Sequence, residues 1–362
     1  MSVRIFATGG HSGLGFEALK TLLASPALAS GGNLTLMVRD ENSAAVAKSR
    51  HTLSEQHKAA TSSSSSRLSI GTQIMELASP SSVRGAAAAI KPELQADSVP
   101  AVGQDIFLLN AAVAKPARQC VVDSDRASGR LSYPSDHLFS DDGLIETTAC
   151  VNHVAHLLFI TLLIPSITQN AKRGRKTRIV FTGSALHRSI KDLSVLDRFF
   201  SSSSHASASS WTLRETYAAS KFLQMLGVRA IRRRIQDALE AAAAPAGSVE
   251  VVVVQPGFVP QTGLCRDSNL VTRFAMSYVL PWAPFATSPN AAGKFIADAC
   301  TMDLSASPLQ AEDEDGFHAK DGLVPSALLE VRAKNQCFGT LDPCTADIQL
   351  QEQWWPAACD HS

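Results

Sequence analysis

The fold of this chain is decided by one stretch, Thr8-Gly9-Gly10-His11-Ser12-Gly13-Leu14-Gly15. It follows an apolar run, Val3–Ala7, and opens an amphipathic one, Leu14–Ala24, as a turn between a strand and a helix does. Glycine at positions 9, 13 and 15 lets the turn close tightly and lets its backbone approach a bound group. The amide groups at the start of the helix then face an anion such as a pyrophosphate. The stretch therefore predicts a nucleotide-binding turn.

Strand-like and helix-like runs alternate along the rest of the chain. The predicted strands are Val3–Ala7, Leu34–Val38, Leu68–Met75, Asp105–Ala111, Arg178–Thr182 and Val249–Gln255. The predicted helices are Leu14–Ala24, Ser81–Ile90, Glu146–Gln169, Leu213–Ala243 and Pro289–Cys300. Such alternation is typical of βαβ units, and strands nearly continuous in Val, Ile, Leu and Phe are typical of a sheet covered on both faces. We expect an α/β protein with a doubly wound parallel sheet in three αβα layers, the Rossmann fold.

Three polar stretches interrupt the alternation, near residues 62–66, 115–142 and 189–210. Serine-rich sequence buries little apolar area, so we interpret them as surface insertions rather than as linkers between domains. Residues 1–302 are expected to form one nucleotide-binding catalytic domain that contains these insertions. The less regular residues 303–362 are expected to form a C-terminal extension packed on the same domain.

The composition argues against several classes of protein. Of the 362 residues, 45% are hydrophobic and 18% charged, with 33 basic side chains against 33 acidic ones. A net charge of zero gives no indication of the basic surface that binds nucleic acid. No uninterrupted apolar run approaches the roughly 20 residues that span a bilayer, so we expect no transmembrane segment. The densest basic cluster, Arg229 with Arg232–Arg234, is predicted to be a solvated or subunit-facing helix surface.

Cysteine usage and the two ends of the chain favour a reducing, cytoplasmic location. The seven cysteines form no CxxC pair, so neither a zinc site nor a disulfide framework is predicted. No charged segment precedes the first strand as in a signal peptide, and Asp360-His361-Ser362 matches no targeting signal. No metal is expected, because no carboxylate or third ligand completes a site around His153 and His156. An apolar stretch near residues 258–286 leaves peripheral membrane association open.

The glycine-rich turn resembles that of the short-chain dehydrogenases/reductases. Its spacing, T-G-x-x-x-G-x-G, is similar to theirs and differs from the G-x-G-x-x-G of two-domain dehydrogenases. Further matches follow in the family's order from residue 3 to about residue 300. The resemblance implies that the turn holds a nicotinamide cofactor through Thr8, Gly9, His11, Ser12, Gly13, Leu14 and Gly15.

Arg39, at the tip of the second predicted strand, favours NADP(H) over NAD(H). A carboxylate at this position binds the ribose 2′-OH of NAD, whereas a guanidinium binds the 2′-phosphate of NADP. Leu36–Asp40 is similar to the A-C-R-[DN] segment of family members that use NADPH. The alternative is a surface ion pair between Arg39 and Asp40.

The resemblance implies further cofactor contacts after three other strands. Glu76-Leu77 stands where the family has Asp-Leu beside the adenine, and Asn110-Ala111-Ala112 resembles the family's N-N-A-G. The sixth strand ends in Pro256-Gly257, with Val259 and Thr262 expected near the nicotinamide carboxamide. The family's commoner form has this threonine one residue earlier. The longer spacing resembles the protochlorophyllide-reductase and retinol-dehydrogenase-like branch, including fungal reductases, and implies a role in secondary metabolism.

Tyr217-Ala218-Ala219-Ser220-Lys221 predicts the chemistry. On a helix, Tyr217 and Lys221 lie on one face, and the lysine charge lowers the pKa of the phenol toward neutral pH. The stretch has the family's Y-x-A-S-K form. By resemblance, Ser184 is the serine that binds the substrate oxygen, and Asn152 holds a water that connects the lysine to solvent.

The resemblance implies an NADP(H)-dependent oxidoreductase that reduces a carbonyl, or oxidises the alcohol, of a hydrophobic small molecule. The apolar residues between 258 and 286 fit a bulky substrate, and they fit equally a helix that packs on the domain. A C=C reductase of the protochlorophyllide-reductase type and a non-catalytic NADPH-binding regulator remain alternatives, and the turn spacing disfavours an epimerase or dehydratase. Family members often pair through the helices that carry Asn152 and Tyr217, so a homodimer or homotetramer is compatible with the sequence.

Overall fold

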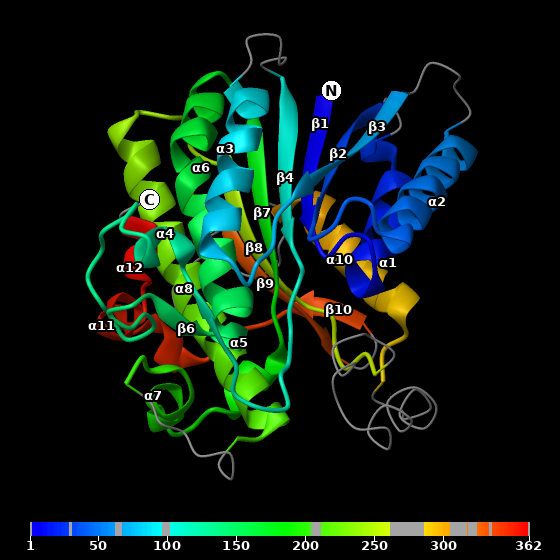
Figure 1. Cartoon of the computed structure of the whole chain (residues 1–362). Coiled ribbons are helices and arrows are strands. Elements are labelled where there is room, and N and C mark those ends of the chain that lie inside the picture. The colour runs from blue at the N-terminus through cyan, green and yellow to red at the C-terminus, as the bar shows by residue number, and fades with distance from the viewer. Residues whose placement is uncertain are drawn as a thin grey trace.

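The central element is a sheet of eight strands in the order β10-β9-β8-β7-β4-β1-β2-β3 (Figure 1). The structure is a computed structural model that describes residues 2–28, 31–61, 67–95, 102–203, 211–260, 286–304, 317, 324–332 and 335–360. The strands are β1 (Ser2–Thr8), β2 (Gly31–Val38), β3 (Arg67–Ile74), β4 (Gly103–Leu109), β7 (Lys176–Thr182), β8 (Val249–Gln255), β9 (Ser326–Arg332) and β10 (Asn335–Phe338). Every neighbouring pair is parallel except β9 and β10.

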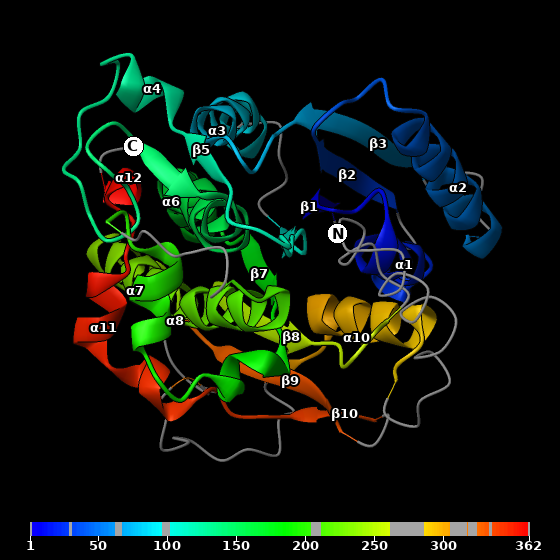
Figure 2. The same cartoon turned by 60° about the horizontal axis from the view of Figure 1, so that its bottom comes forward.

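Helices cover both faces of this sheet (Figures 1 and 2). One face carries α3 (Pro80–Gln95), α6 (Ala155–Lys172) and α8 (Leu213–Ala241), and the other carries α1 (Gly13–Leu23), α2 (Ala44–Ala60) and α10 (Pro289–Thr301). Each layer of helices buries its own hydrophobic cluster, because the strands present Val, Ile, Leu and Phe to both sides. The predicted αβα Rossmann fold is confirmed.

The helix that begins at Thr147 and ends at Lys172 is long and apolar enough, by length and composition, to cross a membrane. It consists of α5 (Thr147–Ala149), a π-helical turn (Cys150–Val154) and α6. Within its most apolar 18-residue window the mean hydropathy is 1.7, and 78% of that window is buried inside the fold. This burial is what the central helix of a packed layer requires.

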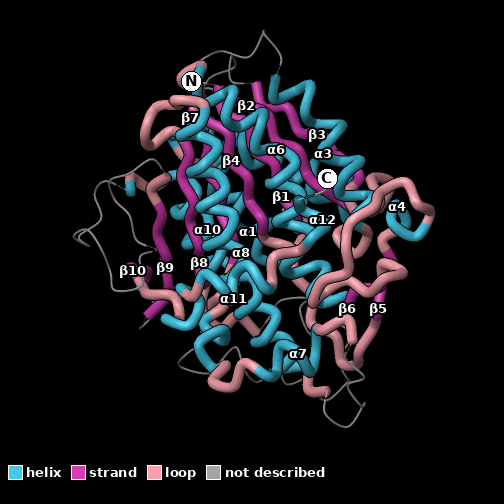
Figure 3. Tube along the Cα trace, turned by 90° about the vertical axis from the view of Figure 1, so that its left-hand side faces the viewer, coloured by secondary structure: helices cyan, strands magenta, loops and turns pink. Residues whose placement is uncertain are grey.

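Two of the interrupting segments contribute to a third hydrophobic cluster. The first contains β5 (Cys120–Val122), α4 (Ser124–Ala127) and β6 (Leu144–Glu146), and the second contains α7 (Ser194–Phe200). Figure 3 shows β5, β6 and α7 toward the lower end of the molecule and α4 above β5 at its right-hand side. Tyr133 and Phe139 from the first, and Phe199 and Phe200 from the second, are buried in this cluster. Residues 62–66 and 204–210 lie outside the described residues.

The residues after 324 extend the sheet and then return to the helices. The described part of this region forms β9, β10, a 3-10 helix (Pro343–Ala346), α11 (Ile348–Gln353) and α12 (Ala357–Asp360). We call residues 335–360 the C-terminal segment. Arg233 and Arg234 of α8 both pair with Glu352, and the buried Arg229 donates to Thr345 Oγ1 at 2.9 Å. The arginine cluster therefore binds the chain's own C-terminal segment, and its interpretation as a solvated or subunit-facing surface is wrong.

Candidate active site

The parallel strands all end at one edge of the sheet, and the predicted motifs meet there. Thr8 at the end of β1 is in register with Met37 of β2 and Leu109 of β4. Thr182 at the end of β7 is in register with Val254 of β8. The sheet thus gathers the residues that follow six strands, which lie far apart in the sequence. Ligands of open α/β sheets bind at this edge.

The glycine-rich turn has the shape that an anion site needs. Gly9 and Gly13 adopt positive φ angles of 64° and 56°, which side chains rarely accept. A Cβ at Gly15 would lie 2.5 Å from the backbone oxygen of Gly9, so only glycine permits this packing. A Cβ at Gly13 would meet no described atom within 4 Å, and the Ser12 side chain makes no capping hydrogen bond to α1. The start of α1 is therefore open for a phosphate group.

Thr8 ties the turn to β4 and α6. Its Oγ1 accepts hydrogen bonds from the backbone nitrogens of Asn110 at 2.9 Å and Ala111 at 3.1 Å. With both lone pairs engaged, the hydroxyl donates its proton to His156 Nε2, 3.1 Å away. Burial lowers the pKa of His156 to about 3, so the imidazole is neutral and can accept. His156 thus stabilises the glycine-rich turn through Thr8. No local pattern in the sequence indicates this role.

Arg39 stands beside Glu76 at the tips of β2 and β3. The Arg39 side chain is 64% exposed, and its Nε lies 4.0 Å from Glu76 Oε2. Asp40 instead accepts a hydrogen bond from the backbone of Asn42 at 2.9 Å, so the alternative pairing with Asp40 is not the one observed. Glu76 also accepts from the backbone of Ala78 at 2.9 Å. The guanidinium remains accessible at the position expected for a 2′-phosphate contact.

Tyr217 and Lys221 lie on one face of α8, close to the carboxyl end of β7. The lysine is 1% exposed, and its Nζ donates to the backbone oxygen of Thr182 at 2.9 Å and to Gln224 Oε1 at 3.0 Å. The same Nζ lies 5.7 Å from the centre of the half-buried Tyr217 ring. Burial lowers the pKa of Lys221 to about 7. The Lys221 amino group and the Tyr217 phenol are thus placed together near the carboxyl end of β7.

Ser184 and Asn152 flank this pair. Ser184 follows β7 and caps the 3-10 helix Ala185–Ser189 by accepting a hydrogen bond from Leu186 N at 3.3 Å, which leaves its own proton to donate. Asn152 is buried in the π-helical turn, where its Nδ2 donates to Val113 O and to Ser220 Oγ, both at 2.9 Å. Asn152 therefore joins the loop after β4 to the helix of Tyr217 and Lys221.

The end of β8 closes the site on its other side. Gly257 has a φ of 83°, and Phe258 forms a bridge with Ala286. Pro256 and Val259 are buried. Thr262 and most of the apolar stretch between 258 and 286 lie outside the described residues.

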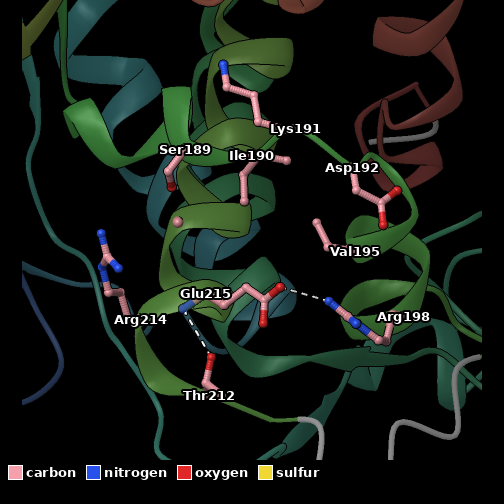
Figure 4. Close-up of a pocket in the computed structure, with 10 residues that line it drawn as sticks. Ser189, Ile190, Lys191, Asp192, Val195, Arg198, Thr212, Arg214 and Glu215 are labelled. Atoms are coloured by element: carbon pink, nitrogen blue, oxygen red, sulfur yellow. Dashed lines mark hydrogen bonds and ion pairs between the residues drawn. The ribbon is translucent and has the colours of Figure 1, made fainter.

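A polar cavity of about 530 Å³ lies between the loop after Ser184 and the first turn of α8 (Figure 4). Arg198 donates to Glu215 across it at 2.8 Å, and Lys191, Asp192 and Arg214 also line it. Neither Ser184 nor Tyr217 is among its lining residues, so this cavity neighbours the proposed reaction site without containing it.

Comparison with known proteins supports the fold. No family model matches the chain, and no curated protein matches its sequence. The crystal structure of an NADPH-dependent reductase involved in bacilysin biosynthesis matches with a TM-score of 0.52 at 11% identity, covering 90% of this chain and 97% of that one. An NADPH-bound carbonyl reductase from chicken fatty liver has a TM-score of 0.48 at 15% identity, covering 82% and 86%. An alcohol dehydrogenase from the archaeon Thermococcus sibiricus, complexed with 5-hydroxy-NADP, has a TM-score of 0.48 at 13% identity, covering 91% and 96%. At 11% identity, the match with the TM-score of 0.52 establishes only that the chain has a Rossmann-type fold.

Proposed function

We propose that the chain is an NADP(H)-dependent oxidoreductase of the short-chain dehydrogenase/reductase type, acting on a carbonyl group or the corresponding alcohol. The observation that carries the proposal is the buried Lys221 ammonium, held by Thr182 O and placed 5.7 Å from the Tyr217 ring at the carboxyl edge of the sheet. Ser184 leaves β7 at this edge with a proton to donate. A proton donor positioned in this way can protonate a developing alkoxide.

The residues at the sheet edge fit the proposed cofactor. The open space beside Gly13, the uncapped start of α1 and the exposed Arg39 suit a pyrophosphate and a 2′-phosphate. When bound, NADPH supplies a hydride to the carbonyl carbon. The similarity of the fold to a protein described as an NADPH-dependent reductase agrees with this choice.

Each residue of the site then has a distinct role. Ser184 donates a hydrogen bond to the substrate oxygen and orients the carbonyl. Tyr217 gives its phenolic proton to that oxygen as the carbon becomes tetrahedral. Lys221 stabilises the phenolate that remains. Asn152 fixes α8 against the loop after β4 through Ser220 and Val113, and we assign it the water that returns a proton from solvent.

The proposed substrate is a bulky hydrophobic carbonyl compound, as in the protochlorophyllide-reductase and retinol-dehydrogenase-like branch. Support comes from the sequence between 258 and 286, which includes Phe274, Met276 and Trp282 after the end of β8. Apolar side chains of this kind suit the binding of an apolar molecule and the exclusion of water. A role in secondary metabolism is part of the same proposal.

The test is the substitution Tyr217→Phe, assayed with NADPH and a hydrophobic ketone such as benzil. Removing the phenolic proton should abolish turnover while NADPH affinity, measured by nicotinamide fluorescence, stays nearly unchanged. Tyr133→Phe is the matched control, because that buried hydroxyl donates to Asp123 at 2.7 Å and has no role in the proposed mechanism, so its loss should leave turnover intact. Retained activity in Tyr217→Phe would exclude the proposed mechanism.

A further inference from the structure

The loop that carries Ser184 is also fixed by hydrogen bonds of a residue that has no role in the proposed mechanism. His187, in the 3-10 helix that follows Ser184, is fully buried. Its Nδ1 lies 2.8 Å from the backbone oxygen of Ser184. Its Nε2 lies 3.1 Å from the backbone nitrogen of Asp342, a residue of the C-terminal segment 155 positions further along the chain. One imidazole therefore joins the backbone of Ser184 to the C-terminal segment.

The partners of the ring define its tautomer. The backbone nitrogen of Asp342 is a donor, so Nε2 accepts and carries no proton, and Nδ1 carries the proton that it donates to Ser184. Gln255, at the end of β8, presents its Nε2 to His187 Nδ1 at 3.2 Å, while its own Oε1 has no partner among the described residues. Because Nδ1 is protonated, the amide must be oriented with its oxygen toward the ring, where it shares the Nδ1–H with Ser184 O.

The C-terminal end of this connection is firmly anchored. Asp342 is buried and caps the 3-10 helix Pro343–Ala346 by accepting a hydrogen bond from Cys344 N at 3.0 Å. Arg188, next to His187, pairs with Glu330 of β9 and donates from Nε to Thr340 O at 3.1 Å. The neutral ring persists because burial lowers the pKa of His187 to about 4. Both ends of the imidazole are therefore fixed to ordered backbone.

We propose that His187 is a positioning residue through which the C-terminal segment sets the place of Ser184 in the active site. The inference rests on the proposed function, since it takes Ser184 as the group that binds the substrate oxygen. A displacement of about 1 Å at a reacting group costs on the order of a hundredfold in rate. The glycine-rich turn is held separately, by Thr8 and Asn110, so loss of His187 should reduce kcat and leave NADPH binding unchanged.

The first test reads the tautomer directly and needs no turnover. In the full chain labelled with ¹⁵N-histidine, His187 should show a protonated Nδ1 and an unprotonated Nε2 at neutral pH, the tautomer that is less common in water. Its signals are assigned by their loss in His187→Asn. An unprotonated Nδ1 or a doubly protonated ring would overturn the proposal.

The second test is kinetic and uses His187→Leu and His187→Asn, each made in the wild type and in Ser184→Ala. With NADPH and benzil, His187→Leu should lower kcat roughly tenfold to a hundredfold in the wild type, and less than about twofold in the Ser184→Ala background. His187→Asn should recover part of the loss, because its Nδ2 can replace the Nδ1–H toward Ser184. The NADPH dissociation constant should stay within about twofold throughout.

Equal losses of kcat in both backgrounds would show that His187 does not act through Ser184 and would overturn the inference. If His187→Leu does not fold, as judged by its melting curve, the same comparison is made with His187→Asn, which loses only the bond to Asp342. The proposed function fails separately, if Tyr217→Phe retains turnover. If Tyr217→Phe is inactive and the effect of His187 substitution is independent of Ser184, the inference about His187 is refuted and the proposed function stands.

Discussion

In the proposed site, a single exposed guanidinium would decide between the two nicotinamide cofactors. Arg39 offers a fork of N–H donors to a 2′-phosphate, and its side chain is 64% exposed. Its Nε lies 4.0 Å from Glu76 Oε2, at the end of the neighbouring strand. A bound phosphate would therefore compete only with a weak, exposed ion pair for the guanidinium.

We expect Arg39→Ala to abolish a preference for NADPH over NADH in a fluorescence titration. The loss of a charge-assisted contact with a phosphate should weaken NADPH binding by roughly 1.5–3 kcal/mol and leave NADH binding nearly unchanged. Arg130→Ala is the control, since Arg130 is 79% exposed in the segment between β5 and β6 and should have no effect. Equal or tighter binding of NADH by the wild type would contradict the assignment of Arg39.

Three buried histidines make the fold sensitive to acid. Burial lowers the pKa values of His153 and His187 to about 4 and of His156 to about 3, from an ordinary value of 6.5. Between these values the three rings bind more protons in the unfolded chain than in the folded one, so their contribution to the free energy of unfolding falls as the pH drops below 6.5. Each histidine contributes a slope of up to about 1.4 kcal/mol per pH unit.

Urea unfolding at pH 7.5, 6.0 and 5.0 should therefore show a progressive loss of stability. His156→Gln should flatten the pH dependence, even though the variant starts from a lower stability. His51→Gln should leave the slope unchanged, because His51 is exposed on α2. A stability that stays constant between pH 6.5 and 5 would contradict the neutral, buried state of these rings.

At the scale of elements, the close contact of α6 with α8 depends on Gly227. A Cβ at this position would lie 2.5 Å from Leu157 Cδ1 and 2.7 Å from His153 Cε1. Gly227→Ala should therefore force the two helices apart and cost about 1–3 kcal/mol of unfolding free energy. Gly85→Ala in α3 is the matched control, since a Cβ there meets no described atom within 4 Å and should stabilise the helix by about 0.5–1 kcal/mol. Chemical denaturation of both variants separates the outcomes, and an unaffected Gly227→Ala would refute this packing.

The elements that the sequence predicts are those with a local pattern. The continuous apolar strands and the glycine-rich turn are visible within a few residues of sequence. Helix α2 is missed because its buried positions are Val46, Ser49, Leu53 and His57, and two of these are polar. Strand β9 is missed because it pairs with β8 across a long and irregular stretch of chain.

The same distinction applies to the site. Tyr217 and Lys221 are four positions apart on one helix, so their meeting follows from helical geometry. His187 and Asp342 are 155 positions apart, and only the folded chain brings them together. The sequence therefore predicts the reacting groups, while the groups that orient them require the tertiary structure.

At the scale of the whole molecule, the C-terminal segment packs on α6 and α8, the helices through which the short-chain dehydrogenases/reductases that the sequence resembles often pair. Trp355 packs 3.8 Å beneath the Arg234 guanidinium, and the backbone oxygen of Trp354 lies 3.1 Å from His153 Nε2. A second copy of the chain could reach this face only by displacing these contacts. We therefore expect one chain per particle in sedimentation, and a stable dimer would contradict this. Arg234→Glu, which repels Glu352, should loosen the segment and increase association.

The order of the strands also has a consequence for how the chain is synthesised. The ribosome delivers β1 to β4 within the first 109 residues, and these strands pair with one another at the centre and one side of the sheet. Ser184 and Lys221 emerge later, and the strands beyond β8, with Asp342, come last. Domains tend to fold from the N-terminus during translation. A nascent chain can thus pair the strands that carry the glycine-rich turn and Arg39 well before the reacting groups, and the contacts expected after β8, are in place.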